Sequence, residues 1–161
     1  MVLKVLLEDW DWKSKCYVHG YFIILLIPHH YQILWLIHKD LGVKIGENCH
    51  FSPYVLIDLV YPELVEIGDN VTIGSNSMIF AHINPTANLN LKKTHYPRKV
   101  AKVTIKSGAV INPGAIITAG VTIGKNSIVS IGSAVFEDIP DNCVVLGNPA
   151  RVVKKLDFED Q

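Results

Sequence analysis

A spacing of six residues between apolar side chains runs through most of this 161-residue chain. After residue 42 it forms three runs: Ile45, Phe51 and Ile57; Ile67, Ile73 and Ile79; and Ile105, Ile111, Ile117, Ile123, Val129 and Val135. The position two before each of these is also apolar or small, and residues two apart face the same side of a strand. Each repeat therefore predicts a very short strand with one large and one small inward side chain.

The position three after each repeated residue determines how the chain turns. It holds asparagine or glycine at Asn48, Asn70, Asn76, Gly108, Gly114, Gly120, Asn126 and Gly132. Both residue types tolerate a left-handed backbone conformation. A left-handed corner after every repeat predicts a three-sided coil of about 18 residues, and stacked coils bury the faces that one coil exposes. We predict an all-β repeat fold of about four to five coils, because a sandwich would need hairpins every ~8–12 residues.

Two stretches interrupt the repeat. The phase slips between Ile57 and Ile67, so residues 59–64 are expected to bulge. Over residues 85–102 the repeat is absent, and this stretch contains two prolines and five basic residues. We interpret 85–102 as a loop that projects from the coils, and loops on a rigid scaffold commonly carry function.

The segments on either side of the repeat are expected to be helical. Residues 1–42 contain a strongly apolar stretch, 21–37, that we interpret as part of an N-terminal helical segment; peripheral membrane contact through 21–37 is the alternative. Pro149 suits the first position of a helix, so residues 149–161 are expected to form a short C-terminal helix and tail. The repeats then occupy residues 43–148.

Composition argues against several partners. Lys+Arg and Asp+Glu are both 15, so no global field would recruit nucleic acid. The three cysteines have no metal-binding spacing, and we interpret them as buried thiols in a reducing compartment. Acidic residues precede the apolar stretch, unlike in a signal peptide. We expect a cytoplasmic protein, membrane-peripheral only if 21–37 touches lipid.

Over about residues 43–156 the chain resembles the hexapeptide-repeat acyltransferases. The resemblance is carried by residues 65–74, 120–127 and 147–153, which read VEIGDNVTIG, GVTIGKNS and GNPARVV. It looks closest to the galactoside, maltose and xenobiotic acetyltransferase branch. The resemblance implies a left-handed parallel β-helix, a homotrimer with active sites at subunit boundaries, and acetyl-CoA as the acyl donor.

His82 is the candidate general base. It follows Ile79 by three, in the corner position otherwise taken by asparagine or glycine, just before the expected loop. The catalytic histidine of the family has a similar place. A histidine pKa near neutrality suits removal of a proton from an acceptor hydroxyl. The alternative is a surface histidine at a turn.

Three residues are candidates for binding the acceptor. Asp58 resembles an acidic position that contacts sugar hydroxyls in the family, although a solvated turn carboxylate is an equal alternative. Asn84 could orient His82 or bind the acceptor, but turn chemistry explains it equally well. His95 could meet the substrate from the loop or be plain surface.

The resemblance also suggests where acetyl-CoA binds. The expected contacts are Asn112, Ala119 and Gly120 for the pantetheine arm, and Arg151 and Lys154 for the phosphates. The late coils nevertheless depart from the family pattern, because a Thr–Lys pair that contacts CoA phosphates is replaced by Phe136-Glu137. This reversal of charge is the main support for a non-catalytic scaffold as an alternative.

The sequence therefore predicts an acetyl-CoA-dependent O-acetyltransferase that acts on a sugar or polysaccharide-precursor hydroxyl. N-acetylation of an amino sugar is the close variant. No metal is expected. A zinc site like that of a γ-class carbonic anhydrase would need His50, His82 and His95, and these lack the closely spaced second and third histidines of that class.

Overall fold

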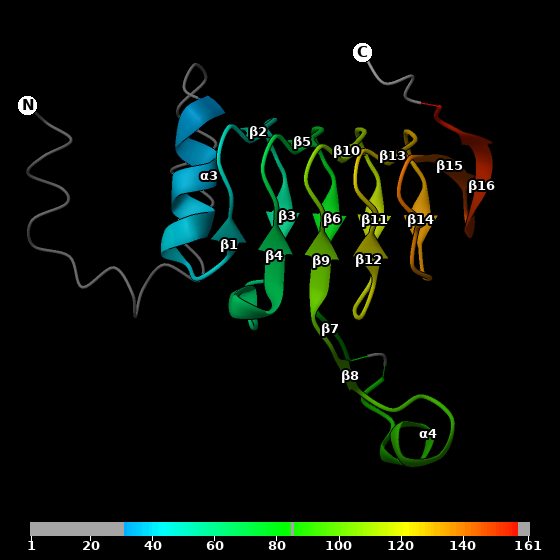
Figure 1. Ribbon diagram of the computed structural model, residues 1–161. Coiled ribbons are helices and arrows are strands. Elements are labelled where there is room, and N and C mark those ends of the chain that lie inside the picture. The colour runs from blue at the N-terminus through cyan, green and yellow to red at the C-terminus, as the bar shows by residue number, and fades with distance from the viewer. Residues whose placement is uncertain (1–30, 85, 158–161) are drawn as a thin grey trace, which may run out of the picture. The chain divides into compact units, whose positions relative to one another are not determined.

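The computed structural model describes residues 31–84 and 86–157, in which short strands form three main sheets that are parallel except for their last strand, β16 (Figure 1). The first sheet holds β1 (Lys44–Ile45), β4 (Val65–Ile67), β9 (Val103–Ile105) and β12 (Thr122–Ile123). The second holds β2 (His50–Phe51), β5 (Thr72–Ile73), β10 (Val110–Ile111), β13 (Ile128–Val129), β15 (Cys143–Gly147) and β16 (Ala150–Lys155). The third holds β3 (Leu56–Ile57), β6 (Met78–Ile79), β11 (Ile116–Ile117) and β14 (Ala134–Val135).

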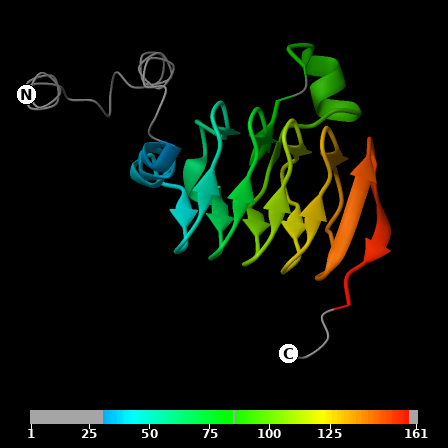
Figure 2. The same ribbon diagram turned by 90° about the horizontal axis from the view of Figure 1, so that it is seen from above.

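Successive strands of the chain belong to successive sheets, so three strands make one coil. Thr104 pairs with Thr122, and Val110 pairs with Ile128, each 18 residues further along the chain. This register is the predicted coil length. The fold is a left-handed parallel β-helix with four complete coils, and β15 belongs to a fifth (Figure 2).

The predicted inward positions form the core. All twelve large repeat residues are at most 8% exposed, and burial of each contributes roughly 1.5–3 kcal/mol. The inward serines are satisfied: Ser77 Oγ donates to a backbone carbonyl at 3.0 Å, and Ser133 Oγ accepts a backbone N–H at 3.1 Å. Of the cysteines, Cys143 is buried and Cys49 is half-buried, while Cys16 lies outside the described residues.

The eight predicted corner residues all adopt the left-handed conformation, with φ between 54° and 86°. Asparagine side chains at the corners also form hydrogen bonds between adjacent coils: Asn48 Nδ2 donates to Asn70 Oδ1 at 2.7 Å. These corners therefore keep the three sheets in register.

The two predicted interruptions both occur where the third sheet turns into the first, which we call the third-to-first corner. In the first coil this corner bulges and includes a 3₁₀ turn, η1 (Pro62–Leu64), so that Lys44 pairs with Glu66, 22 residues on. In the second coil the chain leaves the β-helix as an arm, residues 82–101. The arm contains β7 (His82–Ile83), α4 (Leu89–Thr94) and β8 (Lys99–Val100), and Figure 2 shows α4 projecting from the coils.

The start of the arm differs from the prediction. The chain departs at His82, three residues before the expected loop, and His82 begins the extended strand β7 instead of forming a left-handed corner. β7 pairs antiparallel with β8, with His82 opposite Val100. At a regular corner these backbone groups would hydrogen-bond to the next coil. Here the pairing of β7 with β8 provides their hydrogen-bond partners.

Helix α3 (Tyr31–Asp40) precedes the first coil and contacts β1 and β2. The rest of the predicted N-terminal helical segment, including residues 21–30 of the apolar stretch, lies outside the described residues. Within residues 31–84 and 86–157, no helix has the length and apolarity needed to cross a membrane.

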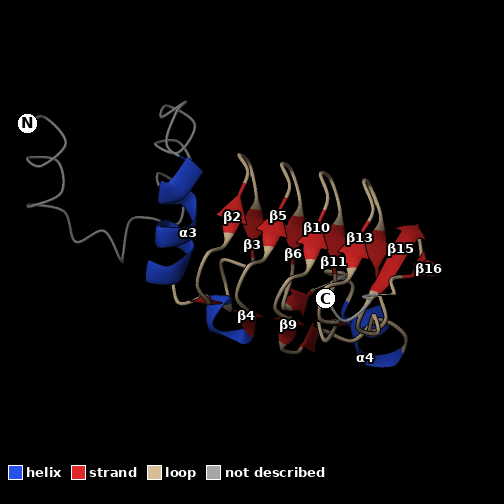
Figure 3. Cartoon of the chain, turned by 45° about the horizontal axis from the view of Figure 1, so that its top comes forward, coloured by secondary structure: helices blue, strands red, loops and turns tan. Residues whose placement is uncertain are grey.

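The predicted C-terminal helix is wrong over residues 150–155. This segment is strand β16, which pairs antiparallel with β15 at the end of the second sheet (Figure 3). The last coil leaves an open sheet edge, and strand pairing satisfies its backbone groups in a way that a helix does not. A proline suited to a helix start was a weaker constraint than this edge.

Candidate active site

His82 and Asp58 meet at the third-to-first corner, although 24 residues separate them. His82 Nδ1 lies 2.5 Å from Asp58 Oδ2, and the side chains of His82 and Asp58 are 24% and 0% exposed. Because an ionised carboxylate only accepts hydrogen bonds, Nδ1 donates to Asp58, and in the neutral imidazole Nε2 then presents its lone pair. The pair therefore has the geometry of an oriented base.

The Asp58 carboxylate accepts hydrogen bonds from four backbone N–H groups in addition to its contact with the His82 ring. Oδ1 accepts from Val60 and Tyr61 at 2.9 and 3.0 Å, and Oδ2 accepts from Ala81 and His82 at 2.8 and 2.9 Å. Burial acts to raise the pKa of Asp58, but the bonds from His82 and the backbone outweigh it and hold that pKa below its ordinary value. Asp58 is thus a fixed negative charge beneath the imidazole.

Two residues beside His82 were not identified as site residues from the sequence. The Tyr61 ring contacts the His82 ring edge-on, with centroids 5.5 Å apart and an interplanar angle of 69°. Arg98 also lies over the Tyr61 ring, with Cζ 5.3 Å from the ring centroid, and donates a hydrogen bond to Tyr61 Oη. In the sequence, Tyr61 belongs to the expected bulge and Arg98 to the expected basic loop. Residue spacing does not indicate that these two regions meet in the fold.

Gly120 presents an unusual backbone N–H at the same corner. At other corners the coils are bonded together, since Gly108 and Gly114 donate their N–H groups to the preceding coil at 2.9 Å. The carbonyl in the equivalent place for Gly120 is that of Ala81, which instead accepts from Ala101 in the arm at 2.9 Å. Within the described part of the chain, the Gly120 N–H is therefore left without a backbone acceptor.

The two small residues predicted to lie along acetyl-CoA share this corner with His82. A Cβ atom on Gly120 would lie 3.0 Å from Lys99 Nζ and 3.2 Å from Ala101 Cβ, so the arm returns directly against it. Gly120 is exposed, whereas Ala119 is buried as a whole residue, backbone included, so of the two only Gly120 is open to a ligand.

The other predicted site residues form no hydrogen bond with the Asp58–His82 pair within the described residues. Asn112 belongs to the corner between the second and third sheets and donates from Nδ2 to the carbonyl of Val129 at 3.0 Å. Asn84 is exposed in the arm. His95 is exposed at the end of α4, where its Nδ1 lies 2.7 Å from Thr94 Oγ1.

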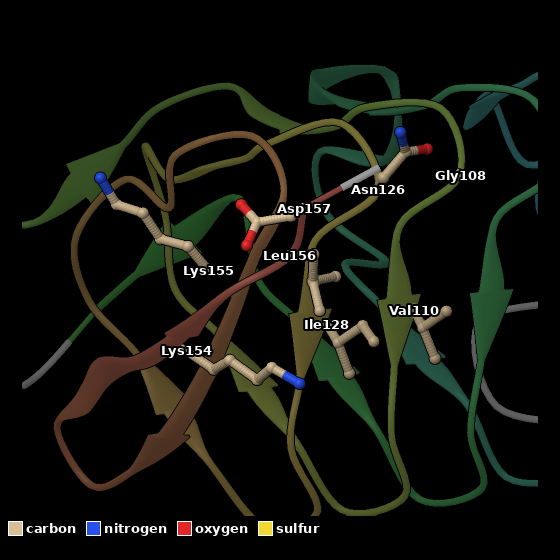
Figure 4. A pocket seen from close by; sticks show the side chains of 8 residues that line it. All are labelled: Gly108, Val110, Asn126, Ile128, Lys154, Lys155, Leu156 and Asp157. Carbon is tan, nitrogen blue, oxygen red and sulfur yellow. The ribbon is translucent and has the colours of Figure 1, made fainter. Parts of the chain in front are cut away.

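The two predicted phosphate-binding residues are both exposed on β16. Arg151 lies 3.6 Å from Glu137, the carboxylate that replaces a lysine of the family pattern. Lys154 lines a hollow of about 510 Å³ on the second sheet (Figure 4), with Gly108, Val110, Asn126, Ile128, Lys155, Leu156 and Asp157. This hollow lies on a different sheet and corner from His82, so it is not the pocket of the base.

The third predicted alternative, a zinc site, has no cluster to support it in the described residues. Within residues 31–84 and 86–157, no group of three or more His, Cys, Asp or Glu side chains could hold a metal ion. His50 lies on the exposed face of the second sheet, away from the third-to-first corner.

Comparison with known proteins gives the same class as the fold and the site. No family model matches the chain. A Bacillus subtilis protein named as an acetyltransferase, YvoF, is 31% identical over 136 residues, which cover 82% of this chain and 74% of that protein. The galactoside O-acetyltransferase of Escherichia coli is 31% identical over 147 residues, which cover 76% of this chain and 68% of that enzyme.

A solved structure is similar as well. The hexapeptide-repeat acetyltransferase of Vibrio cholerae in complex with acetyl-CoA has a TM-score of 0.63 and 26% identity, over 73% of this chain and 62% of that one. The chain belongs to the hexapeptide-repeat acetyltransferases, in the branch that includes galactoside O-acetyltransferase. It is therefore an acyltransferase, and the similar Vibrio cholerae structure holds acetyl-CoA.

Proposed function

We propose that the protein transfers an acetyl group from acetyl-CoA to a hydroxyl of a sugar or polysaccharide precursor, with His82 as the general base. The observation that carries the proposal is the 2.5 Å contact between His82 Nδ1 and the wholly buried Asp58. The choice of a sugar hydroxyl is supported by the relative named galactoside O-acetyltransferase.

The reaction needs a base and an oxyanion donor. His82 Nε2 takes the proton of the acceptor hydroxyl as that oxygen attacks the thioester carbonyl, and Asp58 stabilises the resulting imidazolium. The free N–H of Gly120 is our candidate donor to the oxyanion. When the carbon–sulfur bond breaks, His82 returns the proton to the departing thiolate. Both substrates react directly, and no acyl-enzyme is formed.

Asp58 therefore has a different role from the one its sequence position suggested. Its side chain has no exposed surface, and its oxygens already accept four backbone bonds and the His82 bond. We assign it to orienting His82, and not to contacting acceptor hydroxyls. The acceptor is left to groups exposed around the arm, where Asn84 and His95 stay candidates.

On the donor side, we propose that the pantetheine arm follows the exposed backbone of Gly120, with Ala119 buried beneath it. Arg151 and Lys154 are the candidate phosphate ligands, and the Glu137 carboxylate near Arg151 competes with a phosphate for that guanidinium. Asn112 is better explained as a link between coils. We also carry forward the homotrimer and the cytoplasmic location that the sequence led us to expect.

The test is acetyl transfer to galactose, followed through the free thiol of CoA. His82→Ala should lower kcat by about 10²–10⁴-fold, the usual contribution of a general base. His50→Ala is the matched control, because His50 is exposed on a different sheet. Equal activity of the two variants would show that the base is elsewhere.

Binding of the donor is tested separately by thermal unfolding with and without acetyl-CoA. A ligand that binds only the native state, at about 100 times its dissociation constant, adds roughly 2.7 kcal/mol of stability. The midpoint should rise in the wild-type protein and in His82→Ala alike. An unchanged midpoint at millimolar acetyl-CoA would argue for a different acyl carrier.

A further inference from the structure

The arm concentrates positive charge beside the Asp58–His82 pair. The whole chain has a formal net charge of zero, yet the segment 86–102 contains no aspartate or glutamate. Its five basic residues are Lys92, Lys93, Arg98, Lys99 and Lys102. Such a one-sided segment next to a candidate active site raises the local concentration of anions.

Three of these five cations have ordinary structural explanations. Lys102 Nζ pairs with Glu66 at 2.6 Å. The two lysines of α4 lie in its last turn, where positive charge stabilises a helix. Arg98 and Lys99 remain: Arg98 lies over the Tyr61 ring, and Lys99 lies against Gly120.

Arg98 is held close to the base and keeps most of its donors. Its guanidinium lies over the Tyr61 ring, and Tyr61 contacts the His82 ring. Of its five N–H donors, one is bonded to Tyr61 Oη. Within the described part of the chain, no carboxylate lies within 4.0 Å of it, and its side chain is exposed. Arg98 is therefore a restrained cation without an anionic partner.

The position of Arg98 favours the acceptor over the donor as the source of that anion. The small residues assigned to acetyl-CoA lie in the later coils, whereas Tyr61 belongs to the bulge of the first coil. The long pantetheine arm separates the thioester of acetyl-CoA from its phosphates. A cation one aromatic ring away from His82 lies near the position of the reacting thioester. It is therefore too far from the CoA phosphates to bind them.

We propose that Arg98 is a specificity-determining residue that binds a carboxylate carried by the acceptor sugar. The proposal rests on the proposed function, because it takes His82 as the base. A guanidinium binds such groups through two parallel charge-assisted hydrogen bonds. The contact with the Tyr61 ring and the hydrogen bond to Tyr61 Oη restrain the side chain beforehand, so less conformational entropy is lost on binding.

The experiment compares galactose with galacturonic acid, which differ at C6 in carrying a hydroxyl or a carboxylate. Acetyl transfer at saturating acetyl-CoA and calorimetric binding are both measured on the full chain. Charge-assisted bonds predict that the wild-type protein favours galacturonic acid by about tenfold or more in kcat/KM and in Kd. Arg98→Gln should remove this preference, with the KM for acetyl-CoA changed less than twofold.

The control is Lys93→Gln, an exposed cation of the same arm on α4, which should keep the preference. Equal binding of the two sugars by the wild-type protein, including no binding of either, would overturn the proposal. An effect of Arg98→Gln confined to the KM for acetyl-CoA would assign Arg98 to the donor and also overturn it. Failure of the proposed function is a separate result, since it appears as retained transfer in His82→Ala.

Discussion

The regular corners of this β-helix and the third-to-first corner follow opposite rules. At a regular corner a left-handed Asn or Gly turns the chain, and its N–H bonds to the coil before, as at Gly108 and Gly114. At the third-to-first corner the first coil bulges, the second sends out an arm, and Gly120 loses its acceptor to Ala101. The regular corners hold the coils together, and the candidate active site lies at the corner where the repeat is interrupted.

The largest effect should come from placing a charge inside the regular part. Ile117→Asp puts an unpaired carboxylate at a position that is 0% exposed. The desolvation penalty of several kcal/mol is comparable with a whole domain's stability of about 5–15 kcal/mol. We expect no cooperative urea transition at neutral pH. Ile131→Asp is the control, because Ile131 is 67% exposed at a corner, and it should unfold like the wild type.

Next in size is a pH effect at the start of the β-helix. His38 of α3 is 2% exposed, and burial lowers its pKa to about 4 from 6.5. The unfolded chain therefore takes up the proton first, and stability falls as the pH drops from 6.5 towards 4. The shift corresponds to about 3 kcal/mol.

His38→Phe keeps a ring beside Phe51, whose centroid lies 6.1 Å from that of His38, and removes the titration. Urea unfolding at several pH values should show the slope between pH 6.5 and 4 in the wild type and a flatter one in the variant. Parallel slopes in the two proteins would mean that His38 is not the group responsible.

A smaller loss is expected at the irregular corner from Asp58→Asn. The amide keeps one acceptor oxygen and turns an NH₂ group towards backbone donors, at a cost of about 1–3 kcal/mol. Because folding lowers the pKa of Asp58, its stabilisation is complete above its ordinary value of 3.8 and is lost as the pH falls through the lower, native-state pKa. The two proteins should differ in unfolding free energy at pH 7 and converge in acid. A constant difference would contradict this.

The smallest effect compares two glycines. Both are left-handed, so an added methyl group costs roughly 1–2 kcal/mol in backbone strain at either place. The methyl group added in Gly132→Ala would enter open space, whereas the one added in Gly120→Ala would press on Lys99 and Ala101. Gly120→Ala should lose more thermal stability and also lower kcat, by moving the arm. Identical effects on midpoint and rate would remove Gly120 from the site.

The sequence predicted the regular part because each repeat is specified locally. The spacing of six and the corner residues identified the inward side chains and eight left-handed corners, but not those at Tyr54 and Asn142. It missed the strand at 150–155, because a strand that caps an open edge depends on the neighbour and not on its own period.

The site was only partly predictable for a similar reason. His82 was found through its place after Ile79, and Asp58 through family resemblance. That Asp58 is buried beneath His82, with Tyr61 and Arg98 beside it, depends on how a bulge and an arm from adjacent coils meet. Residue spacing along the chain does not encode that meeting.

The most direct test of the account is a double-mutant cycle on kcat with His82→Ala, Asp58→Asn and both together. If Asp58 acts through His82, the double variant should be no slower than His82→Ala alone, within the error of the assay. If the two losses multiply, Asp58 and His82 act independently, and the oriented base at the third-to-first corner is not the catalytic unit.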